Sequence, residues 1–410
     1  MPSSRISQPL VIMLGALTAL APFSIDAYLP GLPDLARTFH TSASATQLTL
    51  TACLLGLAVG QLVAGPLSDS YGRRRPLLAG LAVYTLASLL CALAPSVWAL
   101  VALRFVQGAA GAGGIVISNA IARDRTSGTA SARLFATLAL VTGLAPVLAP
   151  VIGAQVLQVT SWRGVFVVLA GLGAVLFTVA ATGLAESLPA GRRHRGGVSA
   201  TIRVFRGLLA DRTVLGCALA LGFAAGAMFA YISGGPFVLQ DIYGLSPQAY
   251  SVTFAVNALG FITASQVGGR VVHRTGPRAL LLVGVVMCAV GGIAAFVALA
   301  AHAGLGVVLP TLFVTVTSMG LTFPNAIAHA LADQAGNAGA AAALLGLAQF
   351  LFGAVAAPVV GSAGTDTAVP MGITIAVLGV AAAAACVFLV PRQTGRNTQV
   401  GKATVLSAPR

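Results

Sequence analysis

The clearest scarcity in this sequence is charge. Only 8% of its 410 residues are Asp, Glu, Lys or Arg, whereas a soluble domain carries about 25%. Acids are rarest, with nine Asp and Glu against 23 Lys and Arg, and Lys402 is the single lysine. So few charges cannot cover the surface of a soluble domain of this length. The composition therefore excludes a soluble enzyme and indicates a membrane protein.

Signatures of metal, nucleotide and disulfide chemistry are also missing. No Walker loop, the glycine-rich turn that cradles ATP phosphates, occurs in the chain. The five histidines are isolated, and the five cysteines are dispersed without metal spacing or a disulfide pattern. We therefore expect no cofactor, no metal and no ATP hydrolysis. The cysteines, read as small buried hydrophobes, are Cys53, Cys91, Cys217, Cys288 and Cys386.

Long apolar runs fill the chain instead, and 57% of its residues are hydrophobic. About twelve runs are each long enough to cross a bilayer as a helix. The sequence thus predicts an all-α membrane protein with twelve transmembrane helices, although touching runs leave ten or eleven open. The predicted spans are 10–35, 45–68, 76–95, 98–121, 133–156, 164–186, 213–240, 249–270, 279–300, 304–328, 337–361 and 369–390.

Arginines mark alternate loops. They follow the second, fourth, sixth and eighth spans and recur in the tail, whereas the opposite loops hold only Arg37 and Arg163. The positive-inside rule then places both termini and the long central loop in the cytoplasm. The net charge of +14 therefore reports topology and contact with lipid head groups, and it is not a nucleic-acid footprint.

The sequence also contains an internal repeat. Gly65, Asp69, Gly72 and Arg74 recur as Gly269, His273, Gly276 and Arg278, each at an offset of 204 residues. We expect both sets to lie in a tight cytoplasmic loop between the second and third helix of a half. Parallel halves of this kind occur in transporters. The predicted division is a first six-helix half at 1–186, a basic linker at 187–212, a second half at 213–391 and a cytoplasmic tail at 392–410.

One acid lies deep inside an apolar run. Asp26 occupies the first run, where a charge costs several kcal/mol on insertion scales and marks a functional site by default. Arg104 is the only other strongly charged residue well inside a run. Each lies about nine residues from the outer end of its span, so at roughly 1.5 Å per residue the two share a depth. We expect them to pair and to exchange a proton with their surroundings, which predicts a proton-coupled transporter.

Several motifs carry a family resemblance. GPLSDSYGRRRPL, from Gly65 to Leu77, resembles the loop signature of the major facilitator superfamily, and LRFVQGAAGAGG, from Leu103 to Gly114, resembles its fourth-helix motif. GLAPVLAPVIG, from Gly143 to Gly153, resembles the fifth-helix motif of the drug-exporting branch. FSIDAYLPGLPDLA, from Phe23 to Ala36, resembles the first helix of drug:proton antiporters. The resemblance implies the major facilitator fold, with two pseudo-symmetric six-helix halves.

A narrower resemblance points to a subfamily. Four segments are similar to parts of the bicyclomycin and chloramphenicol/florfenicol resistance exporters. They are SIDAYLPGLP, AMFAYISGGPFVLQ, YGLSP and FPNAIAHAL. By that resemblance, the first-half loop is a gate that latches the two halves in the outward-open state. The fifth-helix motif would be a hinge at the interface of the halves. The gate residues are Gly65, Asp69, Gly72, Arg73 and Arg74, and the hinge residues are Gly143, Pro146, Pro150 and Gly153.

Other polar and aromatic residues within the spans are candidates to line a substrate cavity. Arg104 and Gln107 share one helix face because they are three residues apart. Each remaining candidate is equally compatible with a packing or interhelical hydrogen-bond role. The candidates beside Asp26 and Arg104 are Tyr28, Gln107, Asn119, Phe223, Tyr231, Phe237, Asn257 and Gln349.

These features together predict a monomeric antiporter of the bacterial inner membrane that exports a small amphipathic antibiotic and imports protons. A proton-coupled nutrient or metabolite symporter on the same scaffold is the first alternative. A transport-dead membrane sensor is the second. The fifth-helix motif favours export over uptake, and the expected Asp26–Arg104 pair favours transport over sensing. Neither the drug nor the proton stoichiometry follows from the sequence.

Overall fold

The computed structural model describes residues 8–126, 128–189, 191, 193, 198–332, 334, 338–362, 364 and 367–391. The predicted tail 392–410 and residues 190, 192 and 194–197 of the predicted linker lie outside the described residues. All regular structure within the described ranges is helical. This confirms the all-α class.

Twelve long helices build the described part of the chain. Eleven of them, counted with their short continuations, are long and apolar enough to cross a membrane. The twelfth, α10, is just as long but carries more polar residues, among them Gln248, Asn257 and Gln266. The long helices are α1 (Gln8–Asp26), α3 (Ala43–Tyr71), α4 (Arg74–Ala92), α5 (Val97–Arg125), α6 (Gly128–Val159), α7 (Trp162–Gly183), α9 (Arg212–Pro236), α10 (Pro247–Thr275), α11 (Pro277–Ala300), α12 (Leu305–Leu331), α13 (Ala338–Gly361) and α14 (Val369–Leu389).

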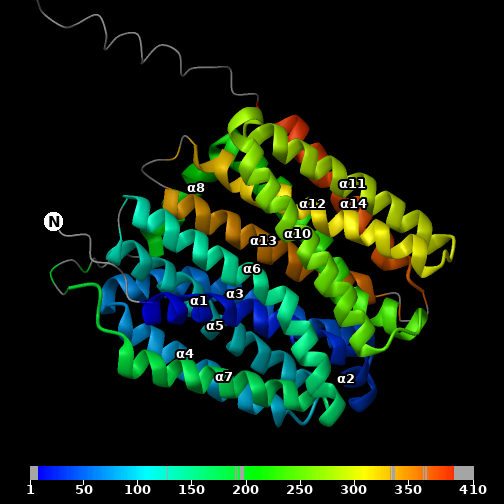
Figure 1. Cartoon of the computed structure of the whole chain (residues 1–410), viewed down its shortest axis with the longest axis horizontal. Helices are drawn as coiled ribbons and strands as arrows, with labels where there is room; N and C mark the ends of the chain where they lie inside the picture. Colours follow the sequence, from blue (N-terminus) through cyan, green and yellow to red (C-terminus); the bar gives the residue numbers. More distant parts are fainter. Residues whose placement is uncertain are drawn as a thin grey trace, which may run out of the picture.

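The helices form two bundles. Helices α1 to α7, in blue to green, lie on one side of the molecule, and α9 to α14, in green to red, lie on the other (Figure 1). Two helix pairs make most of the contact between these halves, namely α3 with α13 and α6 with α10. The two pairs occupy related places in the two halves. The molecule therefore has the pseudo-symmetric arrangement that the repeat predicts.

The repeat extends to helix ends. Helices α3 and α10 have the same length and begin and end 204 residues apart. Ser42 and Ser246 cap their first turns through the side-chain oxygen, as serine commonly does. Gly72 and Gly276 follow them at φ +88° and +78°, a region that favours glycine. The predicted loop is nevertheless shorter than expected, because α3 runs on to Tyr71 and so includes Gly65 and Asp69.

The first predicted span is not a single helix, and the uninterrupted helix over 10–35 is wrong. Helix α1 ends at Asp26, and the chain continues through a 3-10 turn, η1 (Leu29–Gly31), into the short helix α2 (Leu32–Thr38). The cause is local, because Pro30 has no N–H to donate to the carbonyl of Asp26. The break places the one deep acid at a helix end.

Small residues bring the helices into close contact. A Cβ atom on Gly108 of α5 would overlap the carbonyl oxygen of Cys53 on α3, and Gly56 and Gly60 of α3 meet the α5 backbone in the same way. Glycine at such positions lets helix backbones approach within lipid, where van der Waals packing drives association. This packing fixes the position of α5, which carries Arg104.

The two ends of the molecule differ. We call the end that carries Arg73, Arg74, Arg75, Arg123 and Arg125 the arginine-rich end. Within the described residues, the hydrogen bonds and the ion pair between the halves lie towards the opposite end. The polar contacts between the halves that the described residues show therefore lie at one end. These contacts join Arg37 with Asp241, Ser44 with Pro358, Gln47 with Ser233, Thr51 with Ala354, Gln240 with Pro30, Gln248 with Ala154 and Ser251 with Pro150.

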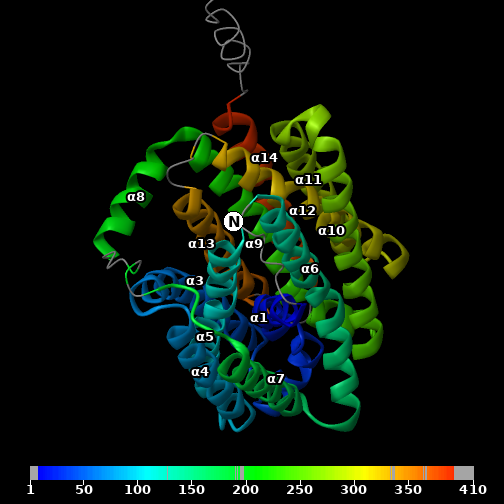
Figure 2. The same ribbon diagram turned by 60° about the vertical axis from the view of Figure 1, so that its left-hand side comes forward.

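The linker between the halves contains a helix that the sequence analysis did not predict. Helix α8 (Val198–Ala210) runs along the outside of the bundle at the arginine-rich end (Figure 2). Its Leu208 is buried with Val214, Ala341 and Leu344 of the second half. The central linker is thus partly ordered against α13.

We predict that Gly108→Ala lowers stability, because the added methyl group has to push α5 away from the Cys53 carbonyl. Overpacking of this kind costs about 1–3 kcal/mol. Thermal unfolding of the purified protein in detergent measures the effect. Gly171→Ala in α7 is the matched control, since no atom lies within 4 Å of its added methyl group. Equal unfolding temperatures for the two variants would refute the packing role.

Candidate functional site

Arg104 lies in the core of the first half. Its side chain is fully buried on α5, and its guanidinium carbon stacks 4.3 Å from the centre of the Tyr28 ring and 5.6 Å from that of Phe166. Its Nη1 donates to Oε1 of Gln107 one turn along the same helix. The Nε and Nη2 atoms have no hydrogen-bond partner. The cation is thus held by aromatic faces and one amide, not by an acid.

A polar chain extends from Gln107 across the first half. The Gln107 amide donates to Ser88 of α4 at 2.7 Å, and Ser88 in turn donates to the Tyr84 carbonyl. The Tyr84 hydroxyl shares a hydrogen bond with Ser24 of α1, two residues before the end of that helix. All four side chains are buried. The chain ties α5 and α4 to α1 near Asp26 and holds the first half as one unit.

Asp26 has no such partner. Its side chain is only 4% exposed, yet no hydrogen bond or ion pair reaches its carboxylate from the part of the chain that the structure describes. The expected Asp26–Arg104 pair is therefore wrong for this structure. The reason is rotation about the helix axis, because Tyr28 covers Arg104 and a residue two positions earlier points roughly 200° away.

The acid instead lies near the second half. Asp26 is within electrostatic range of Tyr231 of α9 and Tyr250 of α10, and also of Cys53 of α3. Both tyrosines are buried, and both pack on Phe254, with ring centres 5.8 Å and 6.2 Å apart. Asn257 donates to the Tyr231 hydroxyl at 2.8 Å. The structure thus brings together Asp26, Tyr231 and Asn257 from the predicted cavity set.

The remaining cavity candidates are scattered. Phe237 begins η3 (Phe237–Ile242) and lines a small cavity of about 10 Å³ towards the opposite end. Phe223 lines an apolar groove of about 640 Å³ between α9, α13 and α14, where it packs edge-on against Phe352. Asn119 and Gln349 are half-buried on α5 and α13. The structure does not gather these four residues around Asp26.

The fifth-helix motif touches both the acid's own helix and the second half. A Cβ atom on Gly153 would overlap the carbonyl oxygen of Ala27, the residue after Asp26. Pro150 accepts a hydrogen bond through its carbonyl from Ser251 of α10 at 3.0 Å, and Gly143 faces Ile262 of the same helix. Helix α6 runs unbroken through Pro146 and Pro150. The motif therefore connects Asp26 to α10.

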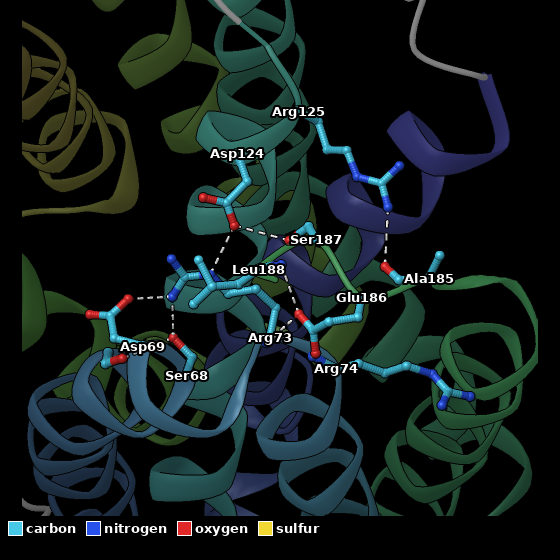
Figure 3. Close-up of polar contacts among 11 residues, drawn as sticks. Ser68, Asp69, Arg73, Arg74, Asp124, Arg125, Ala185, Glu186, Ser187 and Leu188 are labelled. Carbon is cyan, nitrogen blue, oxygen red and sulfur yellow. Dashed lines mark hydrogen bonds and ion pairs between the residues drawn. The ribbon is translucent and has the colours of Figure 1, made fainter. Parts of the chain in front are cut away.

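A second polar cluster lies at the arginine-rich end (Figure 3). Arg73 is 8% exposed, and its guanidinium pairs with Asp69 at 2.5 Å and with Asp124 at 3.0 Å. Ser68 accepts a further hydrogen bond from it, and Ser187 donates to Asp124. Burial alone would lower the pKa of Arg73, but the hydrogen bonds and charges of Asp124 and Asp69 raise it. The cluster stabilises the charged arginine.

Glu186 completes this cluster from the segment after α7. Its carboxylate accepts hydrogen bonds from the backbone N–H groups of Arg73, Arg74 and Leu188. It thereby caps the start of α4, where backbone N–H groups have no helical partner. Partial burial would raise the pKa of Glu186, but these backbone hydrogen bonds lower it below its ordinary value. The acid is also why Gly72 admits no side chain, since a Cβ there would meet its carboxylate.

Within the described residues, the partners of Asp69 and Arg73 all belong to the first half. A latch across the halves therefore stays a prediction for another conformation. Sequence reasoning missed Asp124 and Glu186, although Asp124 stands between two arginines and Glu186 is the only glutamate in the chain. An acid surrounded by arginines at that end was the available signal.

We predict that Glu186→Gln weakens the protein at neutral pH and that the difference fades in acid. The folded pKa lies below the unfolded value of 4.5, so the contribution is complete above about pH 4.5 and is lost as the pH falls through the folded value. Thermal unfolding of both proteins from pH 7 down to about pH 3, which extends below the unfolded pKa, tests this. Asp34→Asn in α2, which removes one charge far from the cluster, is the control. A gap that stays constant with pH would rule out a charged cap.

The sequence of this chain is similar to those of known membrane transporters. The family model of the Major Facilitator Superfamily matches residues 14–358. An uncharacterised MFS-type transporter of Bacillus subtilis, YdgK, is 38% identical over 97% of this chain and 99% of its own. A bicyclomycin resistance protein homolog of Haemophilus influenzae is 31% identical over 93% and 96%. A chloramphenicol resistance protein of Pseudomonas aeruginosa is 31% identical over 67% and 64%.

Solved structures share the fold. The nucleoside transporter NupG superposes with a TM-score of 0.77 at 12% identity, over 93% of this chain and 100% of its own. The inward-open xylose transporter XylE of Escherichia coli superposes at 0.70 with 15% identity, over 94% and 97%. With its helical bundle, its repeat and these relatives, the chain belongs to the Major Facilitator Superfamily and is a multi-pass bacterial membrane transporter, not an enzyme.

Proposed function

We propose that this transporter is a proton-coupled antiporter that exports small amphipathic antibiotics across the bacterial inner membrane, with both termini in the cytoplasm. The names of two relatives, a bicyclomycin resistance protein homolog and a chloramphenicol resistance protein, support the substrate class. The arginine-rich end supports the orientation, because cytoplasmic loops carry an excess of arginine.

The proposal rests on the burial of the Asp26 carboxylate without a cation or hydrogen-bond partner among the described residues. A buried carboxylate without a cation or a hydrogen bond is costly in an apolar interior. Its position at the last residue of α1 adds to the cost, since the negative end of a helix dipole disfavours an anion. Binding a proton removes both penalties. A group in this situation exchanges a proton whenever its access to water changes, which is what coupling to a proton gradient requires.

The transport cycle that we infer follows from the difference in contacts between the halves at the two ends of the bundle. In this structure the polar contacts between the halves lie towards the opposite end, which supports a state that opens to the cytoplasm at the arginine-rich end. There Asp26 releases its proton and the drug enters. In the outward-open state a proton from outside binds Asp26 and the drug leaves. One charge crossing 100 mV supplies about 2.3 kcal/mol.

Arg104 has a different role from the one expected. Stacked on Tyr28, it holds the segment after Asp26 against α5 and places a positive charge in the core of the first half. The cluster around Asp69 and Arg73 is the gate, and we infer that its contacts rearrange when the arginine-rich end closes. This assignment keeps the predicted gating residues and adds Asp124 and Glu186 to them.

The charge distribution favours a neutral drug. Among the described residues, Asp26 is the one acid buried deep in the bundle, and it is needed for the proton, so no spare carboxylate is left there to balance a permanent cation. The surrounding side chains of Tyr231, Phe254 and Tyr250 are aromatic with a few polar atoms. Apolar walls with a few polar groups suit an uncharged amphipathic molecule.

We predict that Asp26→Asn inserts normally but loses proton-driven export, because the amide keeps the shape and cannot titrate. Drug transport in everted membrane vesicles energised by a proton gradient measures the loss, with the expected rate at the level of the empty vector. Asp34→Asn is the matched control and should transport like the wild type. Export against a gradient at the wild-type rate by Asp26→Asn would eliminate Asp26 as the proton carrier.

We further predict that expression in an efflux-deficient bacterial host raises the tolerated concentration of chloramphenicol, florfenicol or bicyclomycin. A protonophore should cancel the gain, since the proton gradient supplies the energy. Growth assays with and without the protonophore provide the measurement. Resistance confined to permanent cations such as tetraphenylphosphonium would contradict the neutral-drug assignment. Proton-driven uptake in place of export would instead indicate a symporter.

A further inference from the structure

We propose that the hydroxyl groups of Tyr250 and Tyr231 in the second half are the hydrogen-bond donors that hold the ionised Asp26 carboxylate of the first half. This inference rests on the proposed function and names the residues that regulate its proton site. The link locks the empty, deprotonated carrier closed at the opposite end. It thereby makes the return of the carrier depend on the drug.

Tyr250 offers the first donor. Its side chain is fully buried, and its hydroxyl has no hydrogen-bond partner among the described residues. Leaving a hydroxyl unpaired in an apolar interior is unfavourable. An unpaired donor and an unpaired acceptor are therefore buried on facing halves. A hydrogen bond between an anion and a hydroxyl satisfies both groups and is stronger than a neutral one.

Tyr231 offers the second donor. Its hydroxyl oxygen accepts from the Asn257 amide, which leaves the hydroxyl proton free to donate. The two tyrosine rings are neighbours, since each lies 3.5 Å from the Cβ position of Gly235. Asn257 is a positioning residue here, because it fixes the direction in which the Tyr231 proton points.

The relative position of the acid and the tyrosines is set through α6. Ser251, the residue after Tyr250, donates to the Pro150 carbonyl. One turn further along α6, Gly153 packs directly on the carbonyl of Ala27, the residue after Asp26. The same face of α6 thus touches the neighbour of the acid and the neighbour of the donor. A further hydrogen bond, from Gln240 of η3 to the Pro30 carbonyl, ties η1 to the second half.

No other charged group competes for the carboxylate among the described residues. Arg104 of α5 is turned to Tyr28. Cys53 of α3 is within electrostatic range of Asp26 but is neutral as a thiol. Helix α6 carries Arg133 only near the arginine-rich end, and Arg163 of α7 donates to the Ala94 carbonyl. Within the described part of the chain, the two tyrosines, from α9 and α10, are the remaining titratable groups within electrostatic range of Asp26.

The link explains strict coupling. Once Asp26 has released its proton, the tyrosines bind the carboxylate across the interface and stabilise closure of the opposite end. A drug that inserts between the halves has to displace this link, and only then can the opposite end open. Without the link, the empty deprotonated carrier could turn outward, collect a proton and return. That cycle would let protons through without export.

The test is a pH titration of Asp26 by infrared spectroscopy on the purified full-length protein in lipid nanodiscs, with no drug present. The carbonyl stretch of the protonated acid is assigned as the band that Asp26→Asn removes. Tyr250→Phe should shift the midpoint of this band to higher pH by about one pH unit, a tenfold change in proton affinity, since a donor to the ionised form is lost. Tyr231→Phe should shift it in the same direction.

Tyr243→Phe is the matched control, because the Tyr243 hydroxyl donates to the Ala303 carbonyl and does not face the acid. Its midpoint should equal that of the wild type. In proteoliposomes, Tyr250→Phe should also pass protons faster than the wild type in the absence of drug, a change that a purely structural defect does not predict together with the shifted titration.

Wild-type midpoints for both Tyr250→Phe and Tyr231→Phe would overturn the inference. These results would leave the proposed function standing if Asp26→Asn still abolished export. Failure of the proposed function shows itself differently, as full proton-driven export by Asp26→Asn.

Discussion

An acid without a cation in the middle of an apolar bundle is the constraint on which this structure depends. Asp26 ends α1 because Pro30 removes the next helical hydrogen bond, and Tyr28, two residues after the acid, occupies the position against Arg104. Arg104 instead stacks on Tyr28 and donates a hydrogen bond to Gln107. The cation of the first half is therefore paired within that half, while the acid lies near the second half, where its protonation can affect the contact between the halves.

Helix α6 connects that acid to the rest of the molecule. Its glycine and proline motif provides a smooth surface that touches Ala27 on one side and α10 on the other. Because the contact at Gly153 leaves no room for a side chain, a shift of α1 has to be accompanied by a shift of α6. The motif therefore acts through packing, while the helix itself stays continuous across both prolines.

The two ends of the bundle differ in their polar contacts. At the arginine-rich end, acids pair with arginines inside one half, and Glu186 caps α4 from a distant segment, so the half is rigid there. At the opposite end, hydrogen bonds cross between halves and many of them end on backbone carbonyls. Rigid halves joined at one end by exchangeable contacts are what a rocking transporter requires.

Hydropathy alone predicted the all-α class and about twelve spans, because a lipid-crossing helix must be apolar over most of its length, but it left the exact number open. The offset of 204 residues also predicted the doubled architecture and the turns at Gly72 and Gly276. Counting residues from the outer end of each span gave the membrane depth of Asp26 and Arg104, so both were identified as candidates from the sequence. Equal depth, however, did not decide whether the two side chains pair. It depended on rotation about a helix axis, on the break at Pro30, and on contacts such as Glu186 with Arg73 that join residues more than a hundred positions apart. Only the tertiary structure fixes these, because no local pattern encodes which faces of distant helices meet.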